Sequence, residues 1–132
     1  MPGSAVSSPR DRRPVFLNLA QIALPVGALA SIAHRISGLL LAIGIPLGVY
    51  GLDLSLRDPQ GFATVAAALE SPPSRVAVVV MAWALAHHLF AGVRHLLMDI
   101  DVGSRLPAAR RSAWMANAGG IAVALMAAVA TW

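Results

Sequence analysis

Three long apolar segments separated by shorter polar stretches dominate the sequence. They cover about residues 29–52, 76–98 and 113–132. The hydrocarbon core of a bilayer is about 30 Å thick and requires roughly 20 apolar residues in a helix. Because each segment reaches this length, the pattern predicts an all-α membrane protein with three transmembrane helices.

The polar stretch between the first two segments also contains a helix signal. Asp58 is a residue type favoured at a helix N-cap, and Pro59 suits the first helical position. Two consecutive prolines, Pro72 and Pro73, follow after an alanine-rich run. The sequence therefore predicts a short extramembrane helix near residues 59–69.

Composition supports a membrane protein and excludes several other classes. The chain has 132 residues, 58% of them hydrophobic and 12% charged, with a mean hydropathy of +0.71. Soluble domains carry roughly 25% charged residues. The absence of cysteine excludes disulfides, thiolate metal sites and cysteine nucleophiles. The net charge of +4 comes from scattered arginines with no basic run, so we expect no nucleic-acid partner.

The arginines predict how the chain crosses the membrane. Basic residues flank the N-terminal side of the first segment and the C-terminal side of the second, and fewer lie between them. The flanking residues are Arg10, Arg12, Arg13, Arg105, Arg110 and Arg111, against Arg57 and Arg75 between the segments. Because positive charge favours the cytoplasmic side, we expect a cytoplasmic N-terminus and a C-terminus on the outside.

The N-terminal region allows two interpretations. In the favoured one, residues 1–12 are a disordered cytoplasmic tail, residues 14–28 lie along the membrane interface, and residues 13–132 form a single membrane domain. In the alternative, the early arginines begin a secretory signal that is cleaved near residues 28–30. Polar residues and a proline interrupt its hydrophobic part, which disfavours a signal peptide.

Ionisable residues inside the apolar segments mark a candidate site. With Asp99 as the cytoplasmic boundary of the second segment, His95 lies about 6 Å deep and His88 about 16 Å deep, at 1.5 Å per residue. His34 and Arg35 lie about 8 Å into the first segment, level with His95. The sequence therefore predicts a polar layer near the cytoplasmic face, with His88 well below it.

Helical periodicity groups these residues on two faces. The face of the second segment is formed by His88, Ala91, Gly92, His95 and Asp99. The face of the first segment is formed by Ser31, His34, Arg35 and Gly38. Since small residues lie between the two histidines of the second face, we expect it to admit a flat, bulky cofactor at Gly92.

Haem is the best candidate for that cofactor. A neutral imidazole is a good iron ligand, and haem propionates need cationic or hydrogen-bonding partners. With His88 as the ligand, the propionates would point toward His34, Arg35, Arg94 and His95. No second histidine or methionine of this chain is placed to complete the coordination, so a second axial ligand must come from another polypeptide.

Two plainer interpretations compete with haem binding. A histidine in a membrane bundle often only hydrogen-bonds another helix. We expect His87, about 100° around the helix from His88, either to do this or to face a partner subunit. Alternatively, the intramembrane histidine and arginine residues relay protons in a haem-free anchor or small transporter.

Two sequence blocks resemble a known family. The first is RPVFLNLAQIALPVGALASIAHRISG, residues 13–38, and the second is HHLFAGVRHLLMD, residues 87–99. They match the patterns Ser-x-x-His-Arg-x-Ser/Thr-Gly and His-x-x-x-Gly-x-Arg-His-x-x-x-Asp, in order and at similar spacing. In these blocks the chain resembles the cytochrome b556 membrane-anchor subunits of bacterial succinate dehydrogenases, and the family's three-span topology covers nearly the whole chain.

The resemblance implies roles for individual residues. It implies that His88 is an axial ligand of haem b and that Ser31 and Arg35 line a ubiquinone site. It further implies that His34, Arg35 and His95 lie near the haem propionates. His87 falls where the family varies, so no ligand role is carried over to it.

The resemblance also implies an assembly in the bacterial inner membrane. The partners would be a second small anchor subunit that supplies the other axial histidine, an iron–sulfur subunit and a flavoprotein subunit. Succinate would be oxidised on those soluble subunits, because this chain has neither cluster cysteines nor a dinucleotide-binding glycine motif. The same scaffold also fits the anchor of a quinol–fumarate reductase.

Overall fold

The computed structural model describes residues 24–132, which form four helices. These are α1 (Val26–Arg57), α2 (Pro59–Glu70), α3 (Pro72–Asp99) and α4 (Leu106–Thr131). Three of them, α1, α3 and α4, are long and apolar enough to cross a membrane. The prediction of an all-α protein with three spans is therefore confirmed.

The N-terminal predictions fall largely outside this range. The tail, residues 1–12, and most of the interfacial segment precede the described residues. The last residues of that segment, from Val26 onward, already belong to α1. The alternative cleavage site at residues 28–30 also lies within α1, where Ala30 is completely buried.

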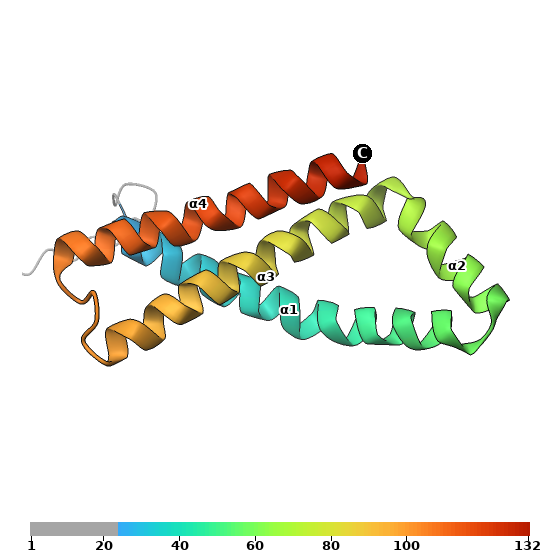
Figure 1. Cartoon of the computed structure of the whole chain (residues 1–132), viewed down its shortest axis with the longest axis horizontal. Coiled ribbons are helices and arrows are strands. Elements are labelled where there is room, and N and C mark those ends of the chain that lie inside the picture. Colours follow the sequence, from blue (N-terminus) through green and yellow to red (C-terminus); the bar gives the residue numbers. More distant parts are fainter. Residues whose placement is uncertain (1–23) are drawn as a thin grey trace, which may run out of the picture.

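Helix α3 is the central element of the bundle (Figure 1). It packs along α4 and crosses α1 near the middle of both helices, while α2 connects the far end of α1 to the start of α3. The start of α1 also contacts α4. The first halves of α1 and α4 and the second half of α3 thus lie together at one end of the molecule (Figure 1).

The helices extend beyond the apolar segments that predicted them. With 32 residues, α1 is about 48 Å long at 1.5 Å per residue, which exceeds the hydrocarbon thickness. Its last turn carries an ion pair between Asp53 and Arg57, one helical turn apart. Charged residues at this spacing support a helix in water, so α1 continues after the apolar pattern ends.

The corner between α1 and α2 forms as predicted. The Asp58 side chain caps α2 by accepting a hydrogen bond from the backbone N–H of Gly61 at 2.7 Å. Pro59 occupies the first helical position, where its missing N–H costs no intrahelical bond. The predicted extramembrane helix is therefore present, ending at Glu70, one residue beyond the predicted end.

Gly61 is required for this corner, and its replacement tests the fold. A Cβ at Gly61 would overlap the backbone carbonyl oxygen of Leu54 on α1, which cannot move without shifting the helix. We expect Gly61→Ala to destabilise the protein by about 1–3 kcal/mol, measured as a lower thermal unfolding midpoint of the purified membrane complex. The matched control is Gly51→Ala, because no atom lies near a Cβ there. Equal midpoints for the two variants would contradict the close approach.

Small residues form the interior of the bundle. Among residues 24–132, the buried apolar positions are, apart from one leucine, all alanines: Ala30, Leu41, Ala84, Ala86, Ala91, Ala113 and Ala116. Large side chains such as Leu39, Leu47 and Val129 are exposed instead. Lipid chains are as apolar as leucine, so membrane helices associate through close packing of small residues. The exposed leucines and valines are therefore the surface that faces lipid or another subunit.

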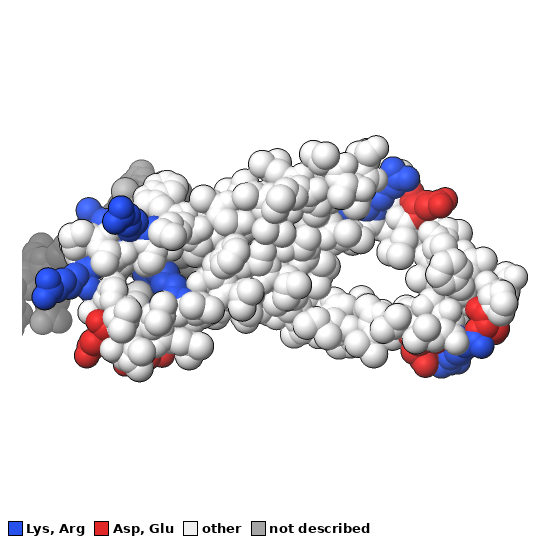
Figure 2. All heavy atoms as spheres, in the orientation of Figure 1, with Lys and Arg blue, Asp and Glu red and all other residues white. Residues whose placement is uncertain are grey.

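Charged side chains lie at the two ends of the elongated molecule (Figure 2). One end contains the α3–α4 turn, with Arg105, Arg110 and Arg111 close by in the sequence. The other contains α2 and mixes basic and acidic residues. The visible face between the ends is uncharged (Figure 2), as expected for a surface in contact with hydrocarbon.

Candidate functional site

Three of the four histidines meet where α1 crosses α3. The imidazole ring of His34 on α1 stacks on that of His88 on α3, with ring centroids 4.1 Å apart and an interplanar angle of 13°. The ring of His95 lies 5.2 Å from that of His34, tilted by 53°. We call His34, His88 and His95 the histidine cluster. The two polar faces predicted from periodicity therefore do face each other.

The His34 ring lies between the rings of the other two histidines and contacts both. This is the order expected from counting residues, which places His95, His34 and His88 at about 6, 8 and 16 Å from the cytoplasmic boundary. Two rings stacked at 4.1 Å leave no room between them for a porphyrin, so His34 is not an axial ligand opposite His88.

The Nδ1 atom of His88 is held by two oxygen atoms of α1. It lies 3.1 Å from the backbone carbonyl oxygen of His34 and 3.2 Å from the Ser37 hydroxyl. A carbonyl oxygen can only accept a hydrogen bond, so Nδ1 is the protonated nitrogen of this imidazole. In the neutral ring the other nitrogen, Nε2, then carries the lone pair, which is the form of histidine that binds a metal.

Two glycines let the histidines approach the opposite helix. A Cβ at Gly38 on α1 would lie 3.0 Å from Cε1 of His88, and a Cβ at Gly92 on α3 would lie 3.4 Å from Nε2 of His34. The ring of each histidine thus packs against a glycine of the opposite helix. The His34 ring lies against Gly92, on the face where the sequence predicts a flat cofactor.

His87 has a separate position at the junction of three helices. Its side chain is 1% exposed, and its Nε2 donates a long hydrogen bond of 3.4 Å to the carbonyl oxygen of Ala30 on α1. Its ring stacks on Trp83, and a Cβ at Gly120 on α4 would lie 2.9 Å from its Cβ. The prediction that His87 hydrogen-bonds another helix is confirmed. Its contacts join α3 to α1 and α4.

Ser31 and Arg35 lie outside the histidine cluster but on α1, the helix that carries His34. They are one turn apart on α1, with Ser31 half-buried and Arg35 exposed. Within residues 24–132 neither side chain forms a hydrogen bond.

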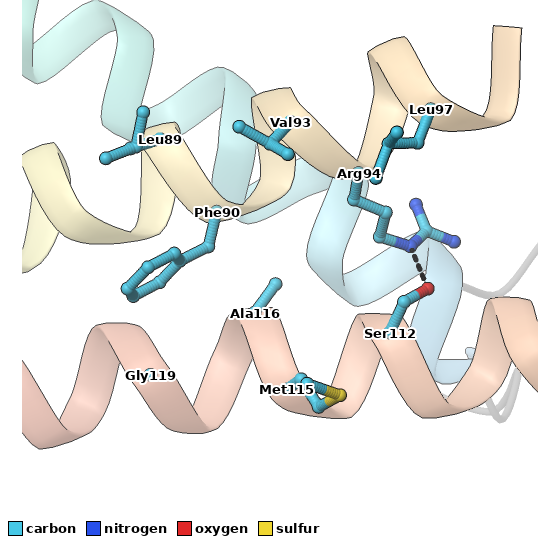
Figure 3. A pocket seen from close by; sticks show the side chains of 9 residues that line it. All are labelled: Leu89, Phe90, Val93, Arg94, Leu97, Ser112, Met115, Ala116 and Gly119. Atoms are coloured by element: carbon cyan, nitrogen blue, oxygen red, sulfur yellow. Dashed lines mark hydrogen bonds between the residues drawn. The ribbon is translucent and has the colours of Figure 1, made fainter. Parts of the chain in front are cut away.

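Arg94 does not join this site, contrary to the expectation that it points toward the same ligand. Figure 3 shows that it reaches from α3 to α4, where its Nε donates to the Ser112 hydroxyl at 3.1 Å. A terminal nitrogen also donates to the carbonyl oxygen of Ala109 at 3.3 Å. Arg94 as a whole is 9% exposed, and it forms a buried polar connection between α3 and α4.

An apolar groove lies beside this connection (Figure 3). Its volume is about 550 Å³, and Phe90, Met115 and Gly119 are among the residues of α3 and α4 that line it. No member of the histidine cluster lines the groove. The groove and the histidine cluster are therefore different places on α3.

Comparison with known proteins gives a consistent result. The sequence model of the family described as "Succinate dehydrogenase/Fumarate reductase transmembrane subunit" matches residues 9–127. A succinate dehydrogenase cytochrome b556 subunit of Coxiella burnetii is 34% identical over 122 residues, covering 92% of this chain and 98% of that protein. The subunit of the same name from Paracoccus denitrificans is 32% identical over 117 residues, covering 89% of this chain and 90% of that protein.

Proposed function

The chain belongs to the family of succinate dehydrogenase/fumarate reductase transmembrane subunits, and we propose that it binds haem b and forms part of a ubiquinone site in a succinate dehydrogenase. Its membership and three membrane-spanning helices make it a multi-pass anchor subunit of a bacterial inner membrane. The chain itself contains no residues for succinate oxidation. That reaction belongs to its soluble partners.

The observation that carries the haem proposal is the hydrogen bonding of His88. Its Nδ1 faces two oxygen atoms of α1, so that Nε2 is the lone-pair nitrogen of the neutral ring and is suited to bind iron. Bound haem b would supply a one-electron redox centre within the membrane. His34 and His95 lie next to His88 in the cluster, and with Arg35 they supply the donors that propionates need.

The second ligand of a six-coordinate haem has to come from elsewhere. Within residues 24–132 the only other histidine in ring contact with His88 is His34, and its stacked position excludes it as the opposite ligand. The second axial histidine is therefore assigned to a second small anchor subunit. This chain and that subunit would hold the haem between them.

Ser31 and Arg35 are proposed to bind ubiquinone. The Ser31 hydroxyl can donate a hydrogen bond to a quinone carbonyl oxygen, and the Arg35 guanidinium can stabilise the negative charge that develops on that oxygen during reduction. Both lie near the start of α1, at the end of the bundle that the arginine distribution assigns to the cytoplasm. An iron–sulfur subunit docked on that side, with the flavoprotein subunit beyond it, would deliver electrons there.

Purification of the tagged chain tests this assignment. From its native membranes it is expected to copurify with the second anchor, iron–sulfur and flavoprotein subunits and to show a b-type signal in a reduced-minus-oxidised spectrum. Expressed alone, it is expected to hold no low-spin six-coordinate haem, because it supplies one axial ligand.

Two results would contradict the proposal. Stable six-coordinate haem in the isolated chain would exclude a shared site. A complete complex without a b-type signal would instead support a haem-free structural or proton-relay anchor. Rates of succinate oxidation and fumarate reduction by the same preparation separate a succinate dehydrogenase from a fumarate reductase.

A further inference from the structure

We infer that Ser37 is a positioning residue for haem ligation: its hydroxyl, together with the His34 carbonyl oxygen, fixes the tautomer and the ring orientation of His88. This inference rests on the proposed role of His88 as an axial ligand. The sequence pattern contains Ser37 in its first block but gives it no function.

Three polar groups at the crossing of α1 and α3 are hydrogen-bonded to one another: the Ser37 hydroxyl, the His34 carbonyl oxygen and Nδ1 of His88. The Ser37 hydroxyl donates to the carbonyl oxygen of His34 at 2.8 Å, which leaves its oxygen lone pairs free to accept. The Nδ1–H of His88 then points at two acceptors, the Ser37 oxygen at 3.2 Å and the His34 carbonyl oxygen at 3.1 Å. With its proton already committed to the carbonyl, the hydroxyl acts as an acceptor toward His88.

Burial strengthens this arrangement. Ser37 has an exposed fraction of 0%, so no water competes for its hydroxyl and its hydrogen bonds operate in a low-dielectric environment. Gly38, the next residue, brings the α1 backbone against the edge of the His88 ring, since a Cβ there would lie 3.0 Å from Cε1. One turn of α1 therefore fixes both the proton on Nδ1 and the position of the ring.

The same contact affects the electronic properties of the ligand. An acceptor on the far nitrogen makes a metal-bound imidazole more basic. A more basic ligand stabilises ferric iron relative to ferrous iron and lowers the midpoint potential of the haem. Removal of the Ser37 oxygen is therefore expected to raise this potential and to weaken retention of the haem.

Ser37→Ala in the assembled complex tests the inference. We expect a haem midpoint potential above that of the wild type and about 10-fold faster transfer of haem to an apoprotein acceptor, the lower end of the loss usual for such supporting contacts. Ser37→Thr, which keeps the hydroxyl and fits the Ser/Thr position of the sequence pattern, is expected to restore both values. Ser55→Ala is the matched control, because Ser55 on α1 makes the same 2.8 Å bond to the carbonyl oxygen three residues earlier but lies far from the histidine cluster.

The outcomes separate this inference from the proposed function. A Ser37→Ala complex with the potential and haem transfer rate of Ser55→Ala would overturn the role of Ser37, as would a Ser37→Thr complex that behaves like Ser37→Ala. His88→Ala, made in parallel, tests the haem ligand itself. Loss of haem in His88→Ala with an unchanged Ser37→Ala would leave the proposed function standing and reject only the positioning role.

Discussion

Replacing His88 with alanine is expected to abolish the b-type absorbance of the assembled complex. The substitution removes the imidazole whose Nδ1 faces two oxygen atoms of α1 and whose Nε2 is the nitrogen proposed to bind iron. A haem with a single remaining axial ligand loses its low-spin coordination and its attachment to this subunit. The measurement is a reduced-minus-oxidised spectrum at equal amounts of complex, with total haem determined by extraction.

The neighbouring histidine provides the matched control. His87→Gln keeps a side-chain N–H that can reach the Ala30 carbonyl oxygen, which His87 bonds in the structure, and it leaves the histidine cluster intact. We expect this variant to retain its b-type signal. Retention of the signal in His88→Ala, or equal loss in both variants, would contradict the assignment of His88 as the iron ligand.

The fold could be predicted from hydropathy because the membrane selects apolar helices of a defined length. The same reason explains where the prediction fell short. Apolar residues mark the part of a helix inside hydrocarbon, whereas α1 continues through Asp53 and Arg57 and α4 begins before Arg110. These polar turns are helical in water or at the interface, so hydropathy does not show where the helices end.

The candidate site could be predicted only as far as helical periodicity reaches. The spacing of His34 with Gly38 and of His88 with Gly92 placed each pair on one face, and the structure brings these faces together. The role of Ser37 could not be predicted. A serine three residues after His34 is an ordinary partner for its carbonyl group, and its contact with His88 depends on how α1 crosses α3.

Arg94 is a residue that the sequence assigned to the site and that tertiary packing uses elsewhere. The sequence made it a candidate partner of the haem propionates, yet its guanidinium donates hydrogen bonds to Ser112 and Ala109 on α4. Neither partner belongs to the sequence blocks that identify the family. A buried arginine needs hydrogen-bond acceptors close by, and which helix supplies them is a property of the tertiary packing.

Replacing Arg35 with leucine is expected to lower ubiquinone reduction by about 100-fold, the size of effect seen when one donor to a developing oxyanion is removed. Leucine retains an aliphatic side chain on the exposed face of α1 but lacks the charge and the hydrogen-bond donors of the guanidinium. Succinate oxidation with an artificial soluble acceptor is expected to stay nearly unchanged, because that reaction ends on the partner subunits. The two rates are measured on the same membranes.

The best control for lost positive charge lies on the same helix. Arg57 is exposed at the far end of α1, where it pairs with Asp53, so Arg57→Leu removes one arginine from the helix without touching the Ser31–Arg35 face. This variant is expected to reduce ubiquinone at the wild-type rate. Equal loss of both activities in Arg35→Leu would indicate failed assembly rather than a quinone role. Since Arg35 is also proposed to contact the propionates, haem content is measured alongside, and a rate loss at normal haem content assigns the effect to the quinone.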